Sequence, residues 1–432
     1  MKRRHFFKSI GAAGGLFLSS AAPVSAFSTV SSFKKAFTGM PRDEEFWKKL
    51  RKQFLIPADY AYLNTGGLGS SPFMVIKTVK KMMDEEDSHP NPGRCKKDWW
   101  KIKEKFAALL GPGVKKEDLA LTGTATESIN IILNGLPLKR GDEVITSTHE
   151  HVALHVPLLN KMKTEGIVIK TFEPDIIDTM GNVRQIEKLM SKHTRLIFTS
   201  HITCTTGQIL PVKEIGQLAK SSGVWYALDG VQVVGHMPIN LRDTGVDFYA
   251  FSGHKWLLGP KRTGILYVRE DLLDTLKPTV VGAYSSDSSD MEKRQLVLHP
   301  TAQRYEYGTQ NDALFYGLGE AVDFIRFIGM QTIWKHNKHL SEMFYKGLQE
   351  IPGLELLSPA GKNNRSAMIS FKLNDKNKNV IRICVDLEGK RLRVRHVNEA
   401  NLDGIRASFH IYNNEEEVER LLGEIKKIAA AK

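Results

Sequence analysis

Two side chains that follow neighbouring apolar segments could together hold an aldehyde cofactor. Lys255 comes just after the segment 248–251, and Asp229 follows the segment 225–228, 26 positions before the lysine. A lysine amine can form a Schiff base with an aldehyde, and pyridoxal phosphate also needs a carboxylate beside its pyridinium nitrogen. A lone lysine is usually a surface cation, and a strand-end aspartate often faces solvent. Their spacing on consecutive predicted strands favours the cofactor-binding interpretation.

Two further segments offer groups that suit the same cofactor. Residues 122–127 (Thr-Gly-Thr-Ala-Thr-Glu) join an apolar segment to a helical one, so they would present hydroxyls and backbone N–H groups at the positive end of a helix. Ordinary helix capping by threonine would explain the same residues. His151 follows another apolar segment, and its imidazole could lie flat over a pyridine ring, although a lone histidine is more often structural. Each segment gains its meaning from the whole set.

These residues must be positioned by a sheet that gathers strand ends, and the sequence predicts such a sheet. Short apolar segments separated by helical patterns indicate an α/β fold with a mainly parallel sheet covered on both faces. The expected strands are 119–121, 143–146, 167–169, 196–198, 225–228, 248–251 and 264–268. Elsewhere the sequence predicts a short strand at 60–64, helices at 43–54 and 99–110, a long helical stretch from 308 to about 351, a strand at 367–373 and a final helix at 415–427.

In this order the segments resemble the class V aminotransferase family of pyridoxal-phosphate enzymes, of fold type I. The resemblance runs from Tyr62 to Asn413, nearly the whole chain after its first 26 residues. That family includes cysteine desulfurases, selenocysteine lyase, kynureninase, serine–glyoxylate aminotransferase and isopenicillin N epimerase. The resemblance implies a large domain with a mainly parallel sheet, a smaller α+β domain, bound pyridoxal 5'-phosphate and a small amino-acid substrate. Residues 63–67 and 393–397 are most similar to the isopenicillin-N-epimerase-like branch.

The resemblance also implies a role for each matching residue. Lys255 would be the Schiff-base lysine, Asp229 the pyridinium partner and His151 the stacking ring, and these three are the catalytic candidates. Gln232 would hydrogen-bond the phenolic oxygen of the cofactor or its imine. The residues expected to hold phosphate are Thr124, Ala125, Thr126, Ser252 and His254. Thr309 would reach the phosphate of the neighbouring subunit in a homodimer.

Arg406 and Asn64 are the candidates for substrate binding. Arg406 matches the family arginine that holds the substrate carboxylate, and a guanidinium can pair with a carboxylate through two parallel hydrogen bonds. A surface strand residue is the plain alternative, but the match at residues 412–413 just downstream favours the clamp. We expect no metal site.

The chain has three cysteines, and their positions narrow the chemistry. Cys95, Cys204 and Cys384 leave one thiol over in any disulfide framework and lack the CxxC spacing of a zinc module. Cysteine desulfurases need a nucleophilic cysteine shortly before the Arg406 position, and residues 391–399 contain none. We predict that Cys384 is a buried, inert strand residue, so persulfide transfer is disfavoured. Cys204 stands where relatives often carry Asn. It is either a tolerated small residue or a weaker hydrogen-bond partner that alters the electronics of the cofactor.

The residues therefore predict an enzyme that acts on the α-carbon of an amino acid, as an aminotransferase or an isopenicillin-N-epimerase-like enzyme. The alternatives are β-elimination of the cysteine-lyase or selenocysteine-lyase type, and a non-catalytic protein that retains the fold for binding. The intact set of Lys255, Asp229 and His151 disfavours the last of these. The three reactions share their first half, the loss of the α-proton, so the sequence leaves them open.

The first 26 residues resemble a twin-arginine signal peptide. Arg3 and Arg4 lie in a basic stretch, residues 10–22 are small and mildly apolar, and residues 24–26 fit a small-x-small cleavage pattern. A transmembrane anchor is disfavoured because the apolar stretch is short and rich in Gly, Ala and Ser. We expect export to the periplasm or another extracytoplasmic space, with no stable membrane insertion after cleavage.

Charge and composition complete the expected organisation. The formal net charge is +13, but four basic residues belong to the signal and the rest are dispersed, which disfavours a nucleic-acid partner. A polar linker is expected at 27–42. The predicted parts are the signal peptide at 1–26, an N-terminal segment at 27–75 that packs with the small domain, the large cofactor-binding domain at 76–320 and the small domain at 321–432.

Overall fold

The computed structural model describes residues 30–90, 95–375 and 377–431. The predicted signal peptide at 1–26 lies outside these residues. Among the helices that are described, none is both long enough and apolar enough to cross a membrane.

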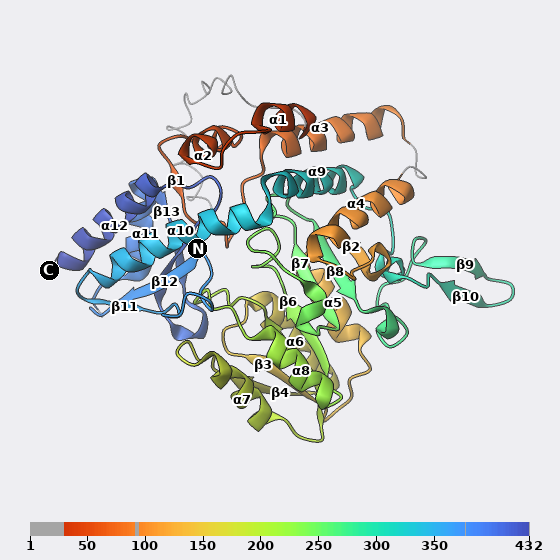
Figure 1. Cartoon of the computed structure of the whole chain (residues 1–432). Helices are drawn as coiled ribbons and strands as arrows, with labels where there is room; N and C mark the ends of the chain where they lie inside the picture. Colours follow the sequence, from red (N-terminus) through yellow and green to blue (C-terminus); the bar gives the residue numbers. More distant parts are fainter. Residues whose placement is uncertain (1–29, 91–94, 376, 432) are drawn as a thin grey trace, which may run out of the picture.

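The described residues form a large sheet whose strands run in the order β2-β8-β7-β6-β5-β3-β4 (Figure 1). β8 pairs antiparallel with β2 and with β7, and the pairs from β7 to β4 are parallel. The strands are β2 (Leu119–Thr122), β3 (Glu143–Ser147), β4 (Val168–Phe172), β5 (Thr194–Ser200), β6 (Trp225–Asp229), β7 (Phe248–Ser252) and β8 (Gly264–Val268). Each predicted strand is present, and the predicted α/β fold is confirmed.

Both faces of this sheet are buried, as continuous apolar strands require. In β6, Tyr226 and Leu228 belong to the core on one face, and Ala227 belongs to the core on the other. Helices α5 and α6 cover the second face. The helices around the sheet are α3 (Phe73–Ser88), α4 (Cys95–Leu110), α5 (Ala125–Gly135), α6 (Val152–Glu165), α7 (Thr179–Leu189), α8 (Val212–Ser221) and α9 (Asp312–Ile328). The sheet therefore lies between two helical layers. The strands that carry the predicted site residues end at its carboxyl edge.

A smaller antiparallel sheet, in the order β11-β12-β15-β14, lies beside the large one and has its own apolar core. It occupies the blue part of Figure 1 together with three helices. The elements are α10 (Met330–Gln349), β11 (Leu354–Leu356), β12 (Met368–Leu373), α11 (Val380–Gly389), β14 (Arg395–Val397), β15 (Gly404–Ser408) and α12 (Glu415–Ala430). Near the N-terminus, β1 (Ala61–Tyr62) pairs in parallel with β13 (Leu392–Arg393). This pairing brings the residues after β1 next to the strand that carries Arg406.

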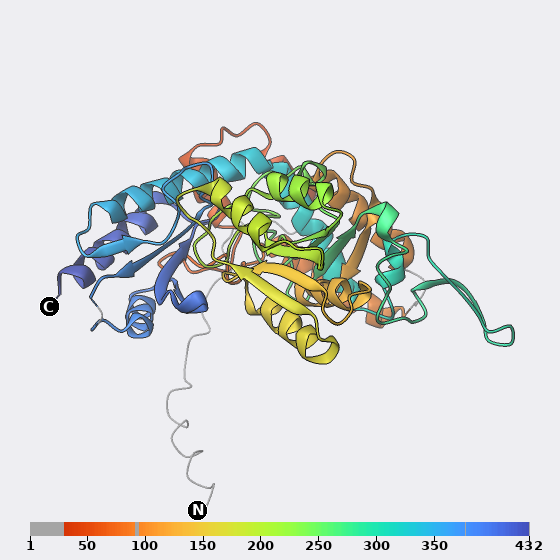
Figure 2. The same ribbon diagram turned by 90° about the horizontal axis from the view of Figure 1, so that it is seen from below.

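The remaining elements are short. A hairpin of β9 (Ser286–Asp290) and β10 (Gln295–Leu298) projects from the body of the molecule (Figure 2). Single 3-10 turns occur at Lys116–Asp118, Leu241–Thr244, Glu270–Leu272, Ala302–Tyr305 and Glu399–Asn401.

Two expectations about local structure were wrong. The predicted linker contains helix α1 (Val30–Phe37), whose Phe33 and Phe37 are fully buried and contact aromatic residues of α9 and α2 (Glu44–Arg51). An i, i+4 aromatic pair gives this polar segment one apolar face, which its Ser and Lys content obscured. The long helical stretch is two helices, α9 and α10, because Gly329 between them adopts φ 94°. That conformation is easily reached only by glycine.

Candidate functional site

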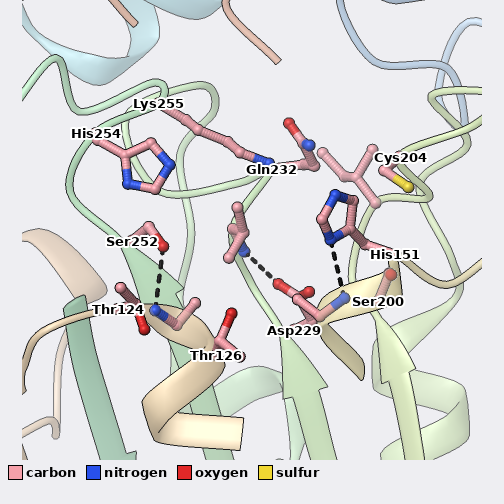
Figure 3. Close-up of a pocket in the computed structure, with 14 residues that line it drawn as sticks. Thr124, Thr126, His151, Ser200, Cys204, Asp229, Gln232, Ser252, His254 and Lys255 are labelled. Carbon is pink, nitrogen blue, oxygen red and sulfur yellow. Dashed lines mark hydrogen bonds between the residues drawn. The ribbon is translucent and has the colours of Figure 1, made fainter. Parts of the chain in front are cut away.

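A pocket of about 200 Å³ lies at the carboxyl edge of the large sheet (Figure 3). We call it the strand-end pocket. Its wall is made by residues from the starts of two helices and from the ends of three strands and the loops that follow them: Thr124, Ala125, Thr126, His151, Ala153, Ser200, Ile202, Cys204, Asp229, Val231, Gln232, Ser252, His254 and Lys255. Ligands of open α/β sheets bind in this kind of crevice.

One end of the pocket is the N-terminus of α5. Thr124 is the N-cap residue, and its Oγ1 accepts a hydrogen bond from the backbone N–H of Glu127. The N–H of Ala125 donates to Oγ of Ser252, 3.2 Å away, so the end of β7 is tied to the start of α5. Thr126 is exposed on the same turn. The capping interpretation of this turn is confirmed. The helix end also faces the pocket, and its role in binding a phosphate stays a prediction.

Lys255 and Asp229 both line the pocket, on opposite sides of it in Figure 3. Lys255 is 9% exposed and Asp229 is 7% exposed. Burial lowers the pKa of Lys255 to about 8, although the charge of Asp229 opposes this shift. Burial raises the pKa of Asp229, against the N–H of Val231, which donates to its Oδ1 at 2.9 Å, and against the charge of Lys255. The pocket thus pairs an easily neutralised amine with a buried carboxyl.

His151 forms the wall opposite Ser252 and is the N-cap residue of α6 (Figure 3). Its Nδ1 accepts a hydrogen bond of 3.1 Å from the N–H of Ala153, which assigns the ring proton to Nε2. Burial, followed by the charge of Lys255, lowers the pKa of His151 to about 4. The imidazole is therefore neutral near pH 7, and its stacking on a cofactor ring stays a prediction.

Arg406 lies beside the pocket on β15 and is fully buried. Its Nη1 donates to the carbonyl oxygen of Cys204, and its Nη2 donates to Oδ1 of Asn64 at 3.3 Å. Nε is buried and has no hydrogen-bond partner in the described part of the chain. Burial, reinforced by the charge of Arg395, lowers the pKa of Arg406 to about 10, so the guanidinium stays charged at neutral pH. Asn64 and Arg406, both predicted to bind substrate, are in direct contact.

Thr309 does not line the pocket of its own chain, and Asn64 and Arg406 lie beside the pocket rather than in its wall. Thr309 is exposed in the segment before α9. Its reach into a neighbouring subunit stays a prediction.

Several residues of the pocket were not predicted from the sequence. Ser200 ends β5, so the rule that pointed to Asp229 on the next strand could have found it. Behind it, the fully buried Glu150 accepts hydrogen bonds from Oγ of Ser147 (2.6 Å), from the N–H of Ser200 (3.0 Å) and from its hydroxyl. Burial raises the pKa of Glu150 to about 7. No sequence pattern separates such a carboxyl from the surface glutamates.

The two cysteines whose side chains are described, Cys204 and Cys384, form no disulfide. Cys204 lines the pocket, donates weakly to the carbonyl oxygen of His149 (3.8 Å), and burial raises its pKa to about 11. The expectation that Cys384 is a buried strand residue was wrong, because its side chain is only half-buried and the residue lies in no strand. It lies on helix α11, whose apolar positions 380, 383, 384 and 387 follow a helical period. Burial raises the pKa of Cys384 to about 11 as well, so the inference of an unreactive thiol stands.

Comparison with known proteins identifies the family to which this chain is similar. The family described as Aminotransferase class-V matches residues 79–421. A probable cysteine desulfurase of Methanothermobacter thermautotrophicus is 29% identical over 395 residues, which cover 87% of this chain and 96% of the relative.

Solved structures agree with the sequence comparison. The apo structure of a cysteine desulfurase from Thermococcus onnurineus NA1 matches with a TM-score of 0.79 and 25% identity, over 88% of this chain and 98% of the other. A mutant of the protein C-DES with glycine covalently linked to its PLP cofactor also matches with a TM-score of 0.79 and 25% identity, over 88% and 99%. C-DES is also described as a cystine C–S lyase in complex with its reaction product, cysteine persulfide (TM-score 0.77, 25% identity, 85% and 98% coverage).

The residues of the strand-end pocket suit pyridoxal phosphate. The N-terminus of α5 offers backbone N–H groups to a phosphate, and the buried Nδ1 of His254 in the same wall has no hydrogen-bond partner among the residues that the structure describes. Asp229 offers a carboxylate for the ring nitrogen and Lys255 a primary amine for the aldehyde. The chain belongs to the class V aminotransferase family and is a pyridoxal-phosphate-dependent enzyme.

Proposed function

We propose that the enzyme is a C–S lyase, which releases a sulfur fragment from the β-carbon of a cysteine-type amino acid without handing it to a protein cysteine. The observation that carries this is the connection from β14 to β15. Residues 398–403 form a tight turn in which Ala400, Asn401 and Asp403 have φ of 53°, 55° and 45°, and this turn contains no cysteine. The likeness to cysteine desulfurases and to a cystine C–S lyase supports chemistry at a sulfur-bearing amino acid. It favours this alternative over the aminotransferase or epimerase reaction that the sequence placed first.

In this proposal the chain's own groups divide the work. Arg406 holds the α-carboxylate, and Asn64 keeps the guanidinium in place. The bound cofactor supplies an electron sink for the pair left when the α-proton departs. Lys255, as a neutral amine, takes that proton. Neutral His151 would cover one face of the bound cofactor, and the Asp229 carboxyl group would hold the ring nitrogen of the cofactor.

For cystine the overall reaction balances without an added oxidant or reductant. The Cβ–S bond breaks and its electron pair leaves with sulfur, which gives cysteine persulfide. The three-carbon remainder is released and takes up one water, which yields pyruvate and ammonia. No group of the protein is oxidised or reduced.

The test is product analysis of the holoenzyme with L-cystine and with S-substituted cysteines. Equal amounts of pyruvate and of the sulfur fragment support the proposal. A product amine that appears only when a keto acid is added, or recovered D-amino acid with deuterium at the α-carbon, would instead identify an aminotransferase or an epimerase.

A chain that lacks all three cysteines should still release sulfur. We expect kcat of the Cys95→Ser, Cys204→Ser, Cys384→Ser variant to fall by less than about tenfold, because no thiol takes part in the elimination and the losses come from packing at Cys204. Pyruvate formation measures this. If an acceptor cysteine were required, the loss would be far larger, and the single variant responsible would identify it.

Loading of the cofactor should depend on pH through Lys255. Only the neutral amine attacks an aldehyde, and the pKa of Lys255 is lowered to about 8 by burial. The rate of cofactor uptake by apoprotein should rise about fivefold from pH 7 to pH 8 and less than about twofold from pH 8 to pH 9. Stopped-flow absorbance measures the uptake. A rate that keeps rising tenfold per unit beyond pH 9 would show that the pKa of Lys255 is not lowered.

Two further proposals rest on the sequence. Export by the twin-arginine route is proposed from residues 1–26, and fractionation of cells that express the full chain with Arg3→Lys and Arg4→Lys tests it. Homodimer formation, with Thr309 near the neighbouring phosphate, is proposed from the family resemblance, and the mass of the enzyme in solution tests it.

A further inference from the structure

Trp256, the residue after Lys255, is fully buried behind the strand-end pocket and holds the side chain of Gln232. Its indole Nε1 donates a hydrogen bond of 2.8 Å to Oε1 of Gln232. The other end of that amide, Nε2, donates to the carbonyl oxygen of Gly66 at 3.0 Å. Gln232 itself is 4% exposed and lines the pocket.

These two contacts determine which way the amide points. An indole N–H can only donate, and a backbone carbonyl can only accept. If the amide of Gln232 were rotated by half a turn, its N–H group would face the indole N–H of Trp256 and its oxygen would face the oxygen of Gly66. Both contacts would become repulsive. The observed orientation is therefore the one that both partners require, and it leaves the second N–H of Nε2 as the group available on that side of the pocket.

The indole of Trp256 is itself held in place on one face by His236. The two rings stack with centroids 3.6 Å apart and an interplanar angle of 4°. Nδ1 of His236 lies 2.8 Å from the backbone oxygen of Gln232, and Nε2 accepts from the N–H of Ala367 at 3.2 Å. Because Nε2 accepts, the ring proton belongs on Nδ1, where it donates back to Gln232. The His236 ring that stacks on Trp256 is thus hydrogen-bonded to Gln232 on one side and to Ala367, just before β12 of the smaller sheet, on the other.

A second histidine fixes the backbone of Trp256. Nε2 of His410 lies 3.0 Å from the carbonyl oxygen of Trp256, and Nδ1 of His410 lies 3.2 Å from Nδ2 of Asn337. A Cβ atom at Gly235 would lie 2.5 Å from the Trp256 carbonyl, so only glycine allows this approach. The tryptophan is therefore fixed through its indole, its ring face and its backbone.

We propose that Trp256 is a positioning residue that sets the orientation of the Gln232 amide, so that an N–H and not the oxygen is presented to the phenolic oxygen of the cofactor. This inference rests on the role proposed for Gln232 and goes beyond it, because the family resemblance assigns nothing to Trp256. A donor beside the phenolic oxygen stabilises its anionic form and disfavours a protonated nitrogen nearby. Trp256 then helps set the pH at which the visible absorption band of the holoenzyme changes.

The test is a spectrophotometric pH titration of holoenzyme variants, combined in a double-mutant cycle. Trp256→Phe keeps an aromatic ring against His236 and removes the indole donor, and Gln232→Leu removes the amide. We expect each substitution to raise the pH midpoint of the change in the visible absorption band by about one unit, which is a tenfold change in the proton equilibrium. The double variant should titrate like Gln232→Leu alone, because no amide remains to be oriented. The control Trp334→Phe, whose indole touches His236 edge-on with ring centroids 5.6 Å apart, should leave the midpoint within about 0.2 unit.

Each other outcome has a defined meaning. If Trp256→Phe shifts the midpoint as much in the Gln232→Leu background as in the wild type, Trp256 acts through packing and the inference is overturned. If Gln232→Leu leaves the midpoint unchanged, the role proposed for Gln232 fails first. If Trp256→Phe does not fold, 3-benzothienylalanine at position 256 retains the size and stacking of the indole without its donor. An unshifted midpoint in that variant equally overturns the inference.

Discussion

Replacing Lys255 by alanine should lower kcat by on the order of 10⁴-fold, the largest loss expected for any single substitution in this enzyme. Lys255 is the primary amine of the strand-end pocket, and in the proposed mechanism it both holds the cofactor and moves the α-proton. Its burial lowers its pKa to about 8, so a large fraction of the amine is neutral at the pH where it must accept a proton. No other side chain in the pocket wall combines these two abilities.

The rate of pyruvate formation measures the loss, and borohydride reduction followed by mass spectrometry shows whether the cofactor is attached to the chain. Wild-type protein should gain the mass of the reduced cofactor, and Lys255→Ala should not. The matched control is Lys261→Ala, an exposed lysine six residues further along the same loop, which should stay within about twofold of wild type. If Lys255→Ala were still labelled by borohydride, another lysine would hold the cofactor and the assignment of the site would be wrong.

Much of the site could be predicted because it obeys a local rule. Asp229 and Lys255 follow apolar segments, and the carboxyl ends of parallel strands meet at one edge of a sheet. A sequence read one segment at a time shows where each strand ends, so it shows which side chains meet. Ser200 obeys the same rule, but it was missed because a serine at a strand end does not by itself indicate cofactor chemistry.

The parts that could not be predicted depend on contacts between distant residues. Asn64 and Arg406 are 342 positions apart and meet because β1 pairs with β13 and places Asn64 beside β15. The contact between Trp256 and Gln232 depends on side-chain orientation inside a core, which no periodicity reveals. Cys384 was assigned to a strand because an apolar run of six residues is ambiguous between a buried strand and one face of a short helix.

The second large effect is expected at Arg406. Replacing it by glutamine should lower kcat/KM by about 10²–10³-fold, because a buried charge-assisted pair with the substrate carboxylate contributes about 2–5 kcal/mol that a neutral amide does not replace. The site is prepared for this pairing. Arg406 is fully buried, its Nη groups are oriented by Cys204 and Asn64, and its Nε has no partner within residues 30–90, 95–375 and 377–431. A buried cation is costly unless a carboxylate neutralises it, and no carboxylate of the described chain bonds to it.

The assignment can be separated from a general loss of structure by comparing two competitive inhibitors that differ in the carboxylate alone. L-Serine should inhibit the wild-type enzyme about 10²-fold more tightly than ethanolamine, and in Arg406→Gln the two inhibition constants should converge. Arg393→Gln, an exposed arginine on β13 that pairs with Glu388 at 3.3 Å, is the control and should preserve the difference. If the two inhibition constants still differed in Arg406→Gln, with an unchanged melting temperature, another cation would have to bind the substrate carboxylate. Arg406 would then have a structural role, through its hydrogen bonds to Cys204 and Asn64.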